Sequence, residues 1–203
     1  MNGEDGDLRA AAPATPGRTV DASKLDLAAA ERATRDLLRA IGADADSPDL
    51  LETPRRVAAS FAELLTPAEF GATVFPNEGY DELVLVRDIS FQTLCMHHLL
   101  PFHGVAHVAY LPGDSIIGLS KLARVVEFFA RDLQLQERMT VQIADWLEQE
   151  LAPRGVGVVL SAEHMCMTIR GVRKPGARTV TSALRGTLRT DARTRQEFFS
   201  LVG

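Results

Sequence analysis

Hydrophobic positions near the start of the chain follow a helical period. Residues 27–41 carry apolar side chains on one side, which predicts a helix that ends at Gly42. Residues 53–65 predict a second helix, because it opens on Thr53-Pro54, a good N-cap followed by a proline at the first helical position. The Pro, Gly and Asn residues between 66 and 82 indicate a loop.

The rest of the chain alternates between strand and helix patterns. Short runs of β-forming residues bounded by turn residues predict strands at 83–86, 89–94, 105–111, 156–162, 165–170 and 179–188. Two long helical periods, 119–133 and 136–151, separate the third run from the fourth, and a short helix from about Asp191 closes the chain. This order predicts an α+β domain. Its sheet is mainly antiparallel, with the paired helices on one face and an N-terminal helical region.

Composition is that of an ordinary globular protein. The 203 residues are 46% hydrophobic and 24% charged, which suits one domain. Residues 1–22 are rich in Gly, Ala, Pro, Asp and Thr without periodicity, so we expect a flexible tail followed by one domain over 23–203. No apolar run approaches the ~20 residues of a membrane helix, and no signal peptide is readable. The two cysteines are too few for a disulfide scaffold, so we expect a cytoplasmic protein.

Charge is distributed unevenly along the chain. The net charge of -5 argues against a general nucleic-acid or membrane-surface binder. Residues 164–195 nevertheless carry eight basic side chains against the single acid Asp191. Such a stretch is most often a solvated face, and it gains meaning only where nearby chemistry needs a polyanion.

Cysteine and histidine spacing suggests a metal. Cys95 and His98 can converge on one ion across a tight bend, and Cys166 would complete a Cys2His set. Three protein ligands leave a fourth position for water, the pattern of a catalytic zinc, and thiolate and imidazole favour zinc over magnesium or calcium. A Cys-x-x-His pair alone is a weak signal, since buried cysteines usually serve packing. His97 and His164 lie beside the proposed ligands and could move protons there.

Two helix starts carry polar groups with more than one interpretation. Ser120, Lys121 and Arg124 begin a predicted helix and could seat an anion, or they could be a capping serine with exposed cations. Glu137 could be a first-turn acid stabilised by the helix dipole, or, with the Gln136 amide, it could read the donor edge of guanine. Residue types alone do not decide between these.

Several segments together resemble the GTP cyclohydrolase I family in order and spacing. The resemblance covers about residues 25–202 and rests on Thr53-Pro-Arg-Arg56-Val, Cys95-Met-His-His98-Leu-Leu-Pro-Phe, Ile117-Gly-Leu-Ser-Lys121, Gln136-Glu-Arg-Met-Thr140, Glu163-His-Met-Cys166-Met-Thr-Ile-Arg170-Gly-Val and Thr194-Arg-Gln-Glu-Phe198. It implies a tunnelling fold (T-fold) in toroidal homodecamers with active sites at subunit interfaces. It also implies hydrolysis of the imidazole ring of GTP, release of C8 as formate, and closure to 7,8-dihydroneopterin triphosphate.

The resemblance also implies a role for each matching residue. Cys95, His98 and Cys166 would bind one zinc ion per subunit, with GTP and water as substrates. His164 would give and take protons, assisted by His97. Substrate contacts would come from Glu137 and Gln136 at the guanine, Ser120 near the ribose and phosphates, and Lys121, Arg124, Arg170 and Arg56 at the triphosphate, some from a neighbouring subunit.

One position departs from the family pattern. Met96 stands where the family usually has glutamate after the first ligand, and loss of a carboxylate there could alter the support of the ligands. All proposed ligands and both histidines remain, so we expect activity to be retained.

Two other functions are compatible with a similar fold. A nitrile reductase of the queuosine pathway would use a cysteine nucleophile and would not need the three-ligand set. A non-catalytic zinc-binding oligomer would not need His97 and His164. The complete set of residues favours the cyclohydrolase.

Overall fold

The computed structural model describes residues 17–203, so most of the expected tail lies outside the described residues. The helices are η1 (Ala22–Lys24), α1 (Leu27–Ala40), α2 (Thr53–Leu65), α3 (Leu119–Ala130), α4 (Gln136–Leu151), α5 (Met165–Thr168), α6 (Gly186–Thr190) and α7 (Ala192–Val202). The strands are β1 (Val74–Pro76), β2 (Val84–Cys95), β3 (Pro101–Leu111), β4 (Ser115–Ile117), β5 (Leu133–Gln134), β6 (Gly155–His164) and β7 (Arg178–Arg185). Within residues 17–203, the structure contains no helix long and apolar enough to cross a membrane.

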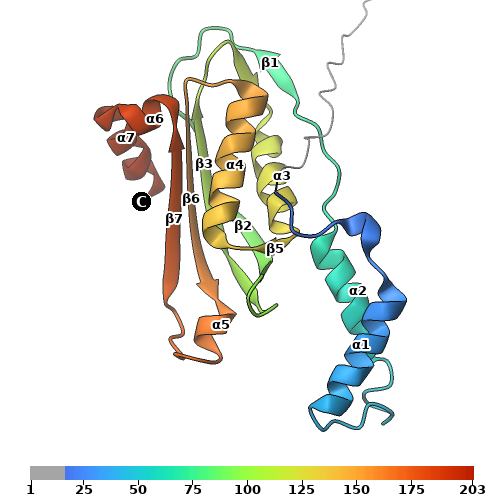
Figure 1. Ribbon diagram of the computed structural model, residues 1–203. Helices are drawn as coiled ribbons and strands as arrows, with labels where there is room; N and C mark the ends of the chain where they lie inside the picture. Colours follow the sequence, from blue (N-terminus) through green and yellow to red (C-terminus); the bar gives the residue numbers. More distant parts are fainter. Residues whose placement is uncertain (1–16) are drawn as a thin grey trace, which may run out of the picture.

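A five-stranded sheet forms the centre of the molecule, with strand order β5-β2-β3-β6-β7. Its long strands pair antiparallel, and only the two-residue β5 runs parallel to its neighbour β2. Helices α3 and α4 cover one face of the sheet (Figure 1). The α+β architecture with a mainly antiparallel sheet and paired helices on one face is therefore confirmed.

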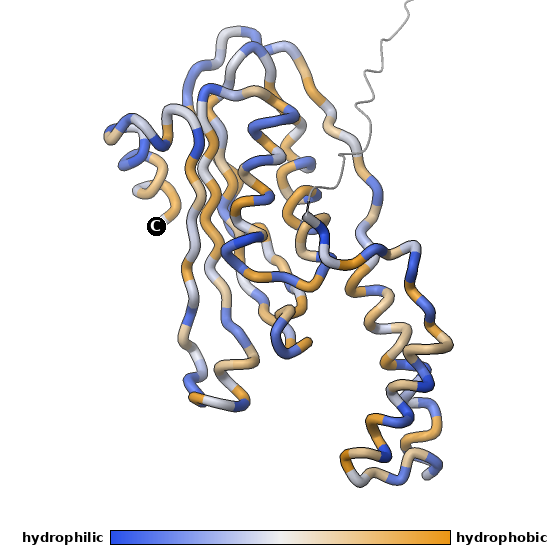
Figure 2. The backbone as a smooth tube through the Cα atoms, in the orientation of Figure 1, coloured by the Kyte–Doolittle hydropathy of each residue, from blue (hydrophilic) through white to orange (hydrophobic). Residues whose placement is uncertain are grey.

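The main core lies between these two helices and the sheet. It is continuous from Phe102 on β3 to Leu122 on α3 and Ile143 on α4, all fully buried. Hydrophobic residues alternate with more polar ones along the strands in Figure 2. Burial of each such side chain contributes roughly 1.5–3 kcal/mol, so this layer supplies much of the stability of the fold.

A smaller core on the opposite face belongs to the end of the chain. Leu188 on α6 and Phe198 on α7 are fully buried there with Ala109 and Val159. Gly157 permits this close approach, because a Cβ at that position would lie 2.7 Å from Leu188 Cδ2 and 2.9 Å from Phe198 Cε1. The helical period of the last residues predicted a helix but not this second layer.

Two predicted strands differ from the structure. Residues 165–170 were expected to be a strand, but Met165–Thr168 form helix α5. The ladder between β3 and β6 ends at the pair of Phe102 and His164, because the next position of β3 is Pro101, which has no N–H to donate. The strand expected to reach 188 ends at Arg185, where Gly186 takes a φ of +55° and α6 begins.

Two short pairings were also missing from the expected pattern. The predicted loop over 66–82 contains β1, which pairs with β4. The predicted helix over 119–133 ends at Ala130, and Leu133 instead begins β5 beside the end of β2.

The N-terminal helices form a hairpin that projects from the body (Figure 1). Helix α1 packs against α2, yet none of its residues is buried. Leu27, Leu37 and Ile41 are 50%, 59% and 69% exposed. Part of the apolar stripe predicted for this helix is therefore exposed to solvent, although α1 packs on α2.

The segment before η1 is anchored to the body by two charged side chains. The Arg18 guanidinium donates to the carbonyl oxygens of Leu65 and Arg131 at 3.0 and 2.8 Å. The fully buried Asp132 carboxylate accepts from the backbone N–H groups of Thr19 and Val20 at 2.7 and 2.9 Å. Residues 18–20 belong to the described part of the expected tail, 17–22. They are hydrogen-bonded to the end of α2 and to the turn between α3 and β5.

Asp132→Asn is expected to destabilise the fold by about 1–3 kcal/mol. The amide would direct an NH2 group at a backbone N–H, so a buried donor would face another donor. Urea unfolding would measure the loss, with Asp114→Asn, an exposed carboxylate, as the matched control. Equal unfolding midpoints for the two variants would show that the Asp132 contacts contribute no stability.

Candidate metal centre

Cys95 and His98, two of the candidate metal ligands, lie on a bend fixed by backbone hydrogen bonds. The Cys95 N–H donates to Leu100 O at 2.9 Å, and the Leu99 N–H donates to Cys95 O at 2.8 Å. Leu99 adopts a left-handed φ of +55°, which closes the bend. The Met96 N–H donates to Gln134 O at 3.1 Å and ties the bend to β5. The bend therefore holds Cys95 and His98 on the same side.

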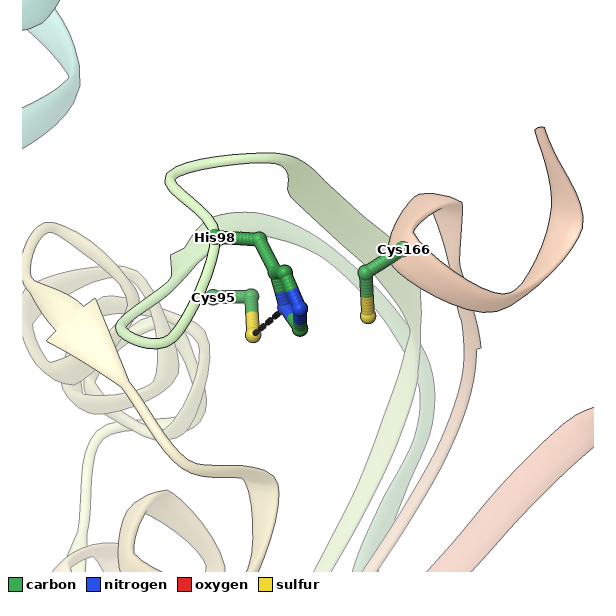
Figure 3. Close-up of side chains that lie close together, drawn as sticks. All are labelled: Cys95, His98 and Cys166. Carbon is green, nitrogen blue, oxygen red and sulfur yellow. Dashed lines mark hydrogen bonds between the residues drawn. The ribbon is translucent and has the colours of Figure 1, made fainter. Parts of the chain in front are cut away.

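Helix α5 brings Cys166 to this bend (Figure 3). One ligand atom from each of Cys95, His98 and Cys166 lies within 4.8 Å of the other two, and Cys95 Sγ lies 3.9 Å from His98 Nδ1. Tetrahedral zinc with ordinary Zn–S and Zn–N bonds places sulfur and nitrogen about 3.6 Å apart. The spacing and the soft donor set therefore fit a zinc ion, and the grouping expected from the sequence is present.

Burial sets the protonation of the second cysteine. Desolvation raises the pKa of Cys166 above its usual range, and the adjacent Cys95 thiol adds to that shift. A metal ion must therefore displace a firmly held proton before this sulfur can coordinate it.

We expect zinc affinity to rise steeply with pH. Two thiols must lose protons on binding, so between about pH 6.5 and 8 each pH unit should raise the affinity by up to about 100-fold. Competition with a chromophoric chelator at several pH values would measure the dependence. An affinity that does not change with pH would contradict coordination through both thiols.

His164 at the end of β6 lies in a defined environment next to this group. Its ring stacks on Phe102, with centroids 4.3 Å apart and planes at 9°. Its Nε2 lies 2.8 Å from Gln136 Oε1. Burial lowers the pKa of His164, and the Glu137 carboxylate opposes that shift. Glu137 lies near the metal ligands because β5 pairs with the end of β2 and α4 starts just after β5. His164 lies there because it ends β6, two residues before Cys166.

The remaining candidates at this end of the sheet are exposed. His97 lies on the bend itself, Glu137 is the second residue of α4, and Arg170 follows α5. Gln136 is different, since it is only 2% exposed and its amide is hydrogen-bonded inside the protein.

Other predicted substrate-binding residues lie elsewhere. Ser120, Lys121 and Arg124 occupy the start of α3, whose other end leads into β5 and so to Cys95. These side chains therefore lie in the half of this helix, roughly 18 Å long, that is remote from β5 and from the metal group of their own chain. Arg56 lies on α2 in the projecting hairpin (Figure 1).

Sequence reasoning missed two groups that shape the site. Phe102 was quoted only as part of a motif, although it stacks on His164. Gln134 supports the bend through its backbone carbonyl, while its amide donates to Phe129 O at 2.7 Å and Gln142 Oε1 at 3.0 Å. The sequence signal available for this second group was the pair of amides, Gln134 and Gln136, just before and at the start of the helix predicted over 136–151.

Comparison with known proteins agrees with these motifs. The family model described as GTP cyclohydrolase I matches residues 30–203. The protein named GTP cyclohydrolase 1 from Bacillus pumilus is 54% identical over 178 residues, 85% of this chain and 94% of that protein. Those from Bacillus subtilis and Rhodopirellula baltica are 54% and 51% identical, over 82% and 89% of this chain and 90% and 80% of their own lengths.

A solved structure also matches in part. The archaeosine synthase QueF-Like in the apo form gives a TM-score of 0.44 at 15% identity, over 53% of this chain and 96% of that chain, too low a likeness to carry an argument. The family model and the relatives are decisive, and the chain belongs to the GTP cyclohydrolase I family.

Proposed function

We propose that the chain is a zinc-dependent GTP cyclohydrolase. It opens the imidazole ring of GTP, releases C8 as formate and yields 7,8-dihydroneopterin triphosphate, the first step of pterin and tetrahydrofolate biosynthesis. The observation that carries the proposal is the convergence of Cys95, His98 and Cys166 in a chain of this family.

The three ligands leave room for chemistry at the metal. A zinc ion held by two thiolates and one imidazole keeps an open position, and when bound it would supply Lewis-acid activation of water near C8. His98 is exposed while Cys95 is buried, so the group opens toward solvent on one side. That asymmetry supports access for a substrate.

Proton transfer is assigned to the two histidines next to the ligands. His164 would give and take protons at the guanine ring, because it lies at the end of β6, two residues before Cys166. His97 would assist and lie close to the phosphates, since the bend presents it to solvent. Desolvation lowers the pKa of His164 and so favours its uncharged form, which suits a group that first accepts a proton.

Guanine recognition is assigned to Glu137. Its carboxylate is exposed near His164 and could accept two hydrogen bonds from the donor edge of guanine. Gln136, the other residue expected to contact guanine, has its amide engaged by the protein, so we leave the guanine contact to Glu137.

Triphosphate binding requires a second copy of the chain. Arg170 lies at the metal end of the sheet, whereas Ser120, Lys121 and Arg124 lie in the half of α3 that is remote from it. A neighbouring subunit that offers its α3 start or its Arg56 to this metal group would complete a cationic pocket for the polyanion.

The surface supports a homo-oligomer, for which we propose the T-fold decamer. Strand β7 is the last strand of the described sheet, so its outer edge is open to pairing, and Val180 on it is exposed. Leu27, Leu37 and Ile41 in the apolar stripe of α1 are exposed as well. Edge pairing and burial of this stripe between copies would close a ring in the cytoplasm.

Met96→Glu is expected to leave turnover within about threefold of the natural chain or to raise it. Met96 contributes a backbone hydrogen bond to the bend, which the substitution keeps, and all three ligands remain. The glutamate would add a carboxylate next to the ligands without replacing any of them. A steady-state assay with GTP would measure kcat, and loss of turnover would contradict tolerance at this position.

The assay for the proposed function is direct. Zinc-loaded protein is incubated with GTP, formate is quantified, and the product is oxidised and examined for neopterin fluorescence. We expect both signals. Zinc binding without either product would instead support a non-catalytic oligomer, and turnover of a different purine would support a related enzyme.

A further inference from the structure

We propose that Gln136 is a positioning residue: its amide oxygen accepts the Nε2–H of His164 and so fixes the orientation and tautomer of this imidazole, which leaves Nδ1 as the nitrogen available to the substrate. This inference rests on the proposed function, in which His164 transfers protons. It assigns to Gln136 a role directed at a side chain of the protein rather than at the substrate.

The neighbours of the Gln136 amide fix which end is nitrogen. Nε2 lies 2.9 Å from Thr179 O, 3.2 Å from Leu160 O and 3.2 Å from Thr181 Oγ1. Two of these partners are backbone carbonyl oxygens, which only accept. A flipped amide would direct its oxygen at both of them, so the NH2 group must face them and Oε1 must face His164.

The amide oxygen in turn fixes the imidazole. Gln136 Oε1 only accepts, and the His164 Nε2 atom at 2.8 Å must therefore donate an N–H. This holds for the neutral ring and for the imidazolium, because Nε2 carries a hydrogen in both. Nδ1 is therefore the ring nitrogen that this contact leaves available.

The packing keeps this arrangement rigid. Phe102, fully buried, stacks on the imidazole and is its cross-strand partner between β3 and β6. The Thr140 hydroxyl lies 2.7 Å from both Gln136 O and Thr181 Oγ1, which ties the first turn of α4 to β7. Because Gln136 is 2% exposed, bulk water competes little for its amide.

The two roles of Gln136 predict different kinetics. A guanine contact made equally in the ground and transition states would raise KM and leave kcat unchanged when it is removed. A residue that orients a proton-transfer group acts in the chemical step, so its removal lowers kcat. We expect Gln136→Met to lower kcat by about 10–100-fold, with KM within about threefold and zinc content unchanged.

The matched control is Gln149→Met. It makes the same change at an exposed position of the same helix α4, 13 residues after Gln136. We expect kcat within about threefold of the natural chain for this variant. A raised KM with unchanged kcat in Gln136→Met would overturn the proposal.

The direct test is the tautomer of His164 in the zinc-loaded natural protein, which also serves if Gln136→Met does not fold. Solid-state ¹⁵N NMR of protein labelled at its five histidines distinguishes protonated from unprotonated ring nitrogens. The signals missing from His164→Asn identify this residue. A protonated Nε2 is expected, and an unprotonated Nε2 would overturn the proposal. The spectra do not depend on turnover, so absence of formate from GTP would refute the proposed function separately.

Discussion

Cys166→Ser is expected to remove the metal and the activity together. A serine hydroxyl does not ionise at neutral pH as a thiol does beside a metal, so only Cys95 and His98 would remain as ligands. Zinc affinities of small sites correspond to about 10–16 kcal/mol, and loss of one of three ligands should cost several of these, at least about 100-fold in affinity. Metal analysis after dialysis and formate release from GTP would measure both effects.

A neighbouring substitution separates loss of a ligand from damage to α5. Met167 is on the same short helix and exposed, so Met167→Leu should keep both zinc and turnover. A normal zinc content in Cys166→Ser would contradict the assignment of this sulfur as a ligand.

His164→Asn is expected to keep the zinc and to lower kcat by about 100- to 10,000-fold. The asparagine side chain cannot carry a proton between water and substrate at neutral pH, whereas the three ligands are untouched. Steady-state kinetics with metal analysis on the same samples would measure the change.

The control for this variant is another histidine of the sheet. His103 lies exposed on β3 and outside the metal group, so His103→Asn should retain turnover. Loss of zinc from His164→Asn would show that His164 holds the metal, and a kcat within tenfold of the natural chain would exclude it from proton transfer.

Local sequence patterns correctly predicted the extent of two helices. The helix expected over 136–151 coincides with α4, and the one expected over 53–65 coincides with α2. The N-cap expected at Thr53 was wrong by one residue, since Glu52 is the N-cap and Thr53 the first helical residue. Residues 165–170 were mispredicted because the ladder ends at Pro101, in a different segment of the chain. Such an end is set by the partner strand and cannot be read from the run itself.

The site was predictable only where its residues are close in sequence. The spacing of Cys95 and His98 indicated a bend that could hold a metal. Cys166 joins them through the pairing of Phe102 with His164, a register that spacing does not reveal. Only the family resemblance identified Cys166 specifically as the third ligand. The contact of Gln136 with His164 likewise depends on how α4 crosses the sheet.

The most direct test of the central claim relates bound zinc to ring opening. Metal-free protein would be titrated with zinc in the presence of GTP labelled with ¹³C at C8, and ¹³C-formate would be followed by NMR. We predict that formate production rises with bound zinc and reaches its plateau at one zinc per chain, with Cys95, His98 and Cys166 as the ligands. A protein that binds one zinc per chain and releases no labelled formate, or that releases formate equally well without zinc, would contradict this account.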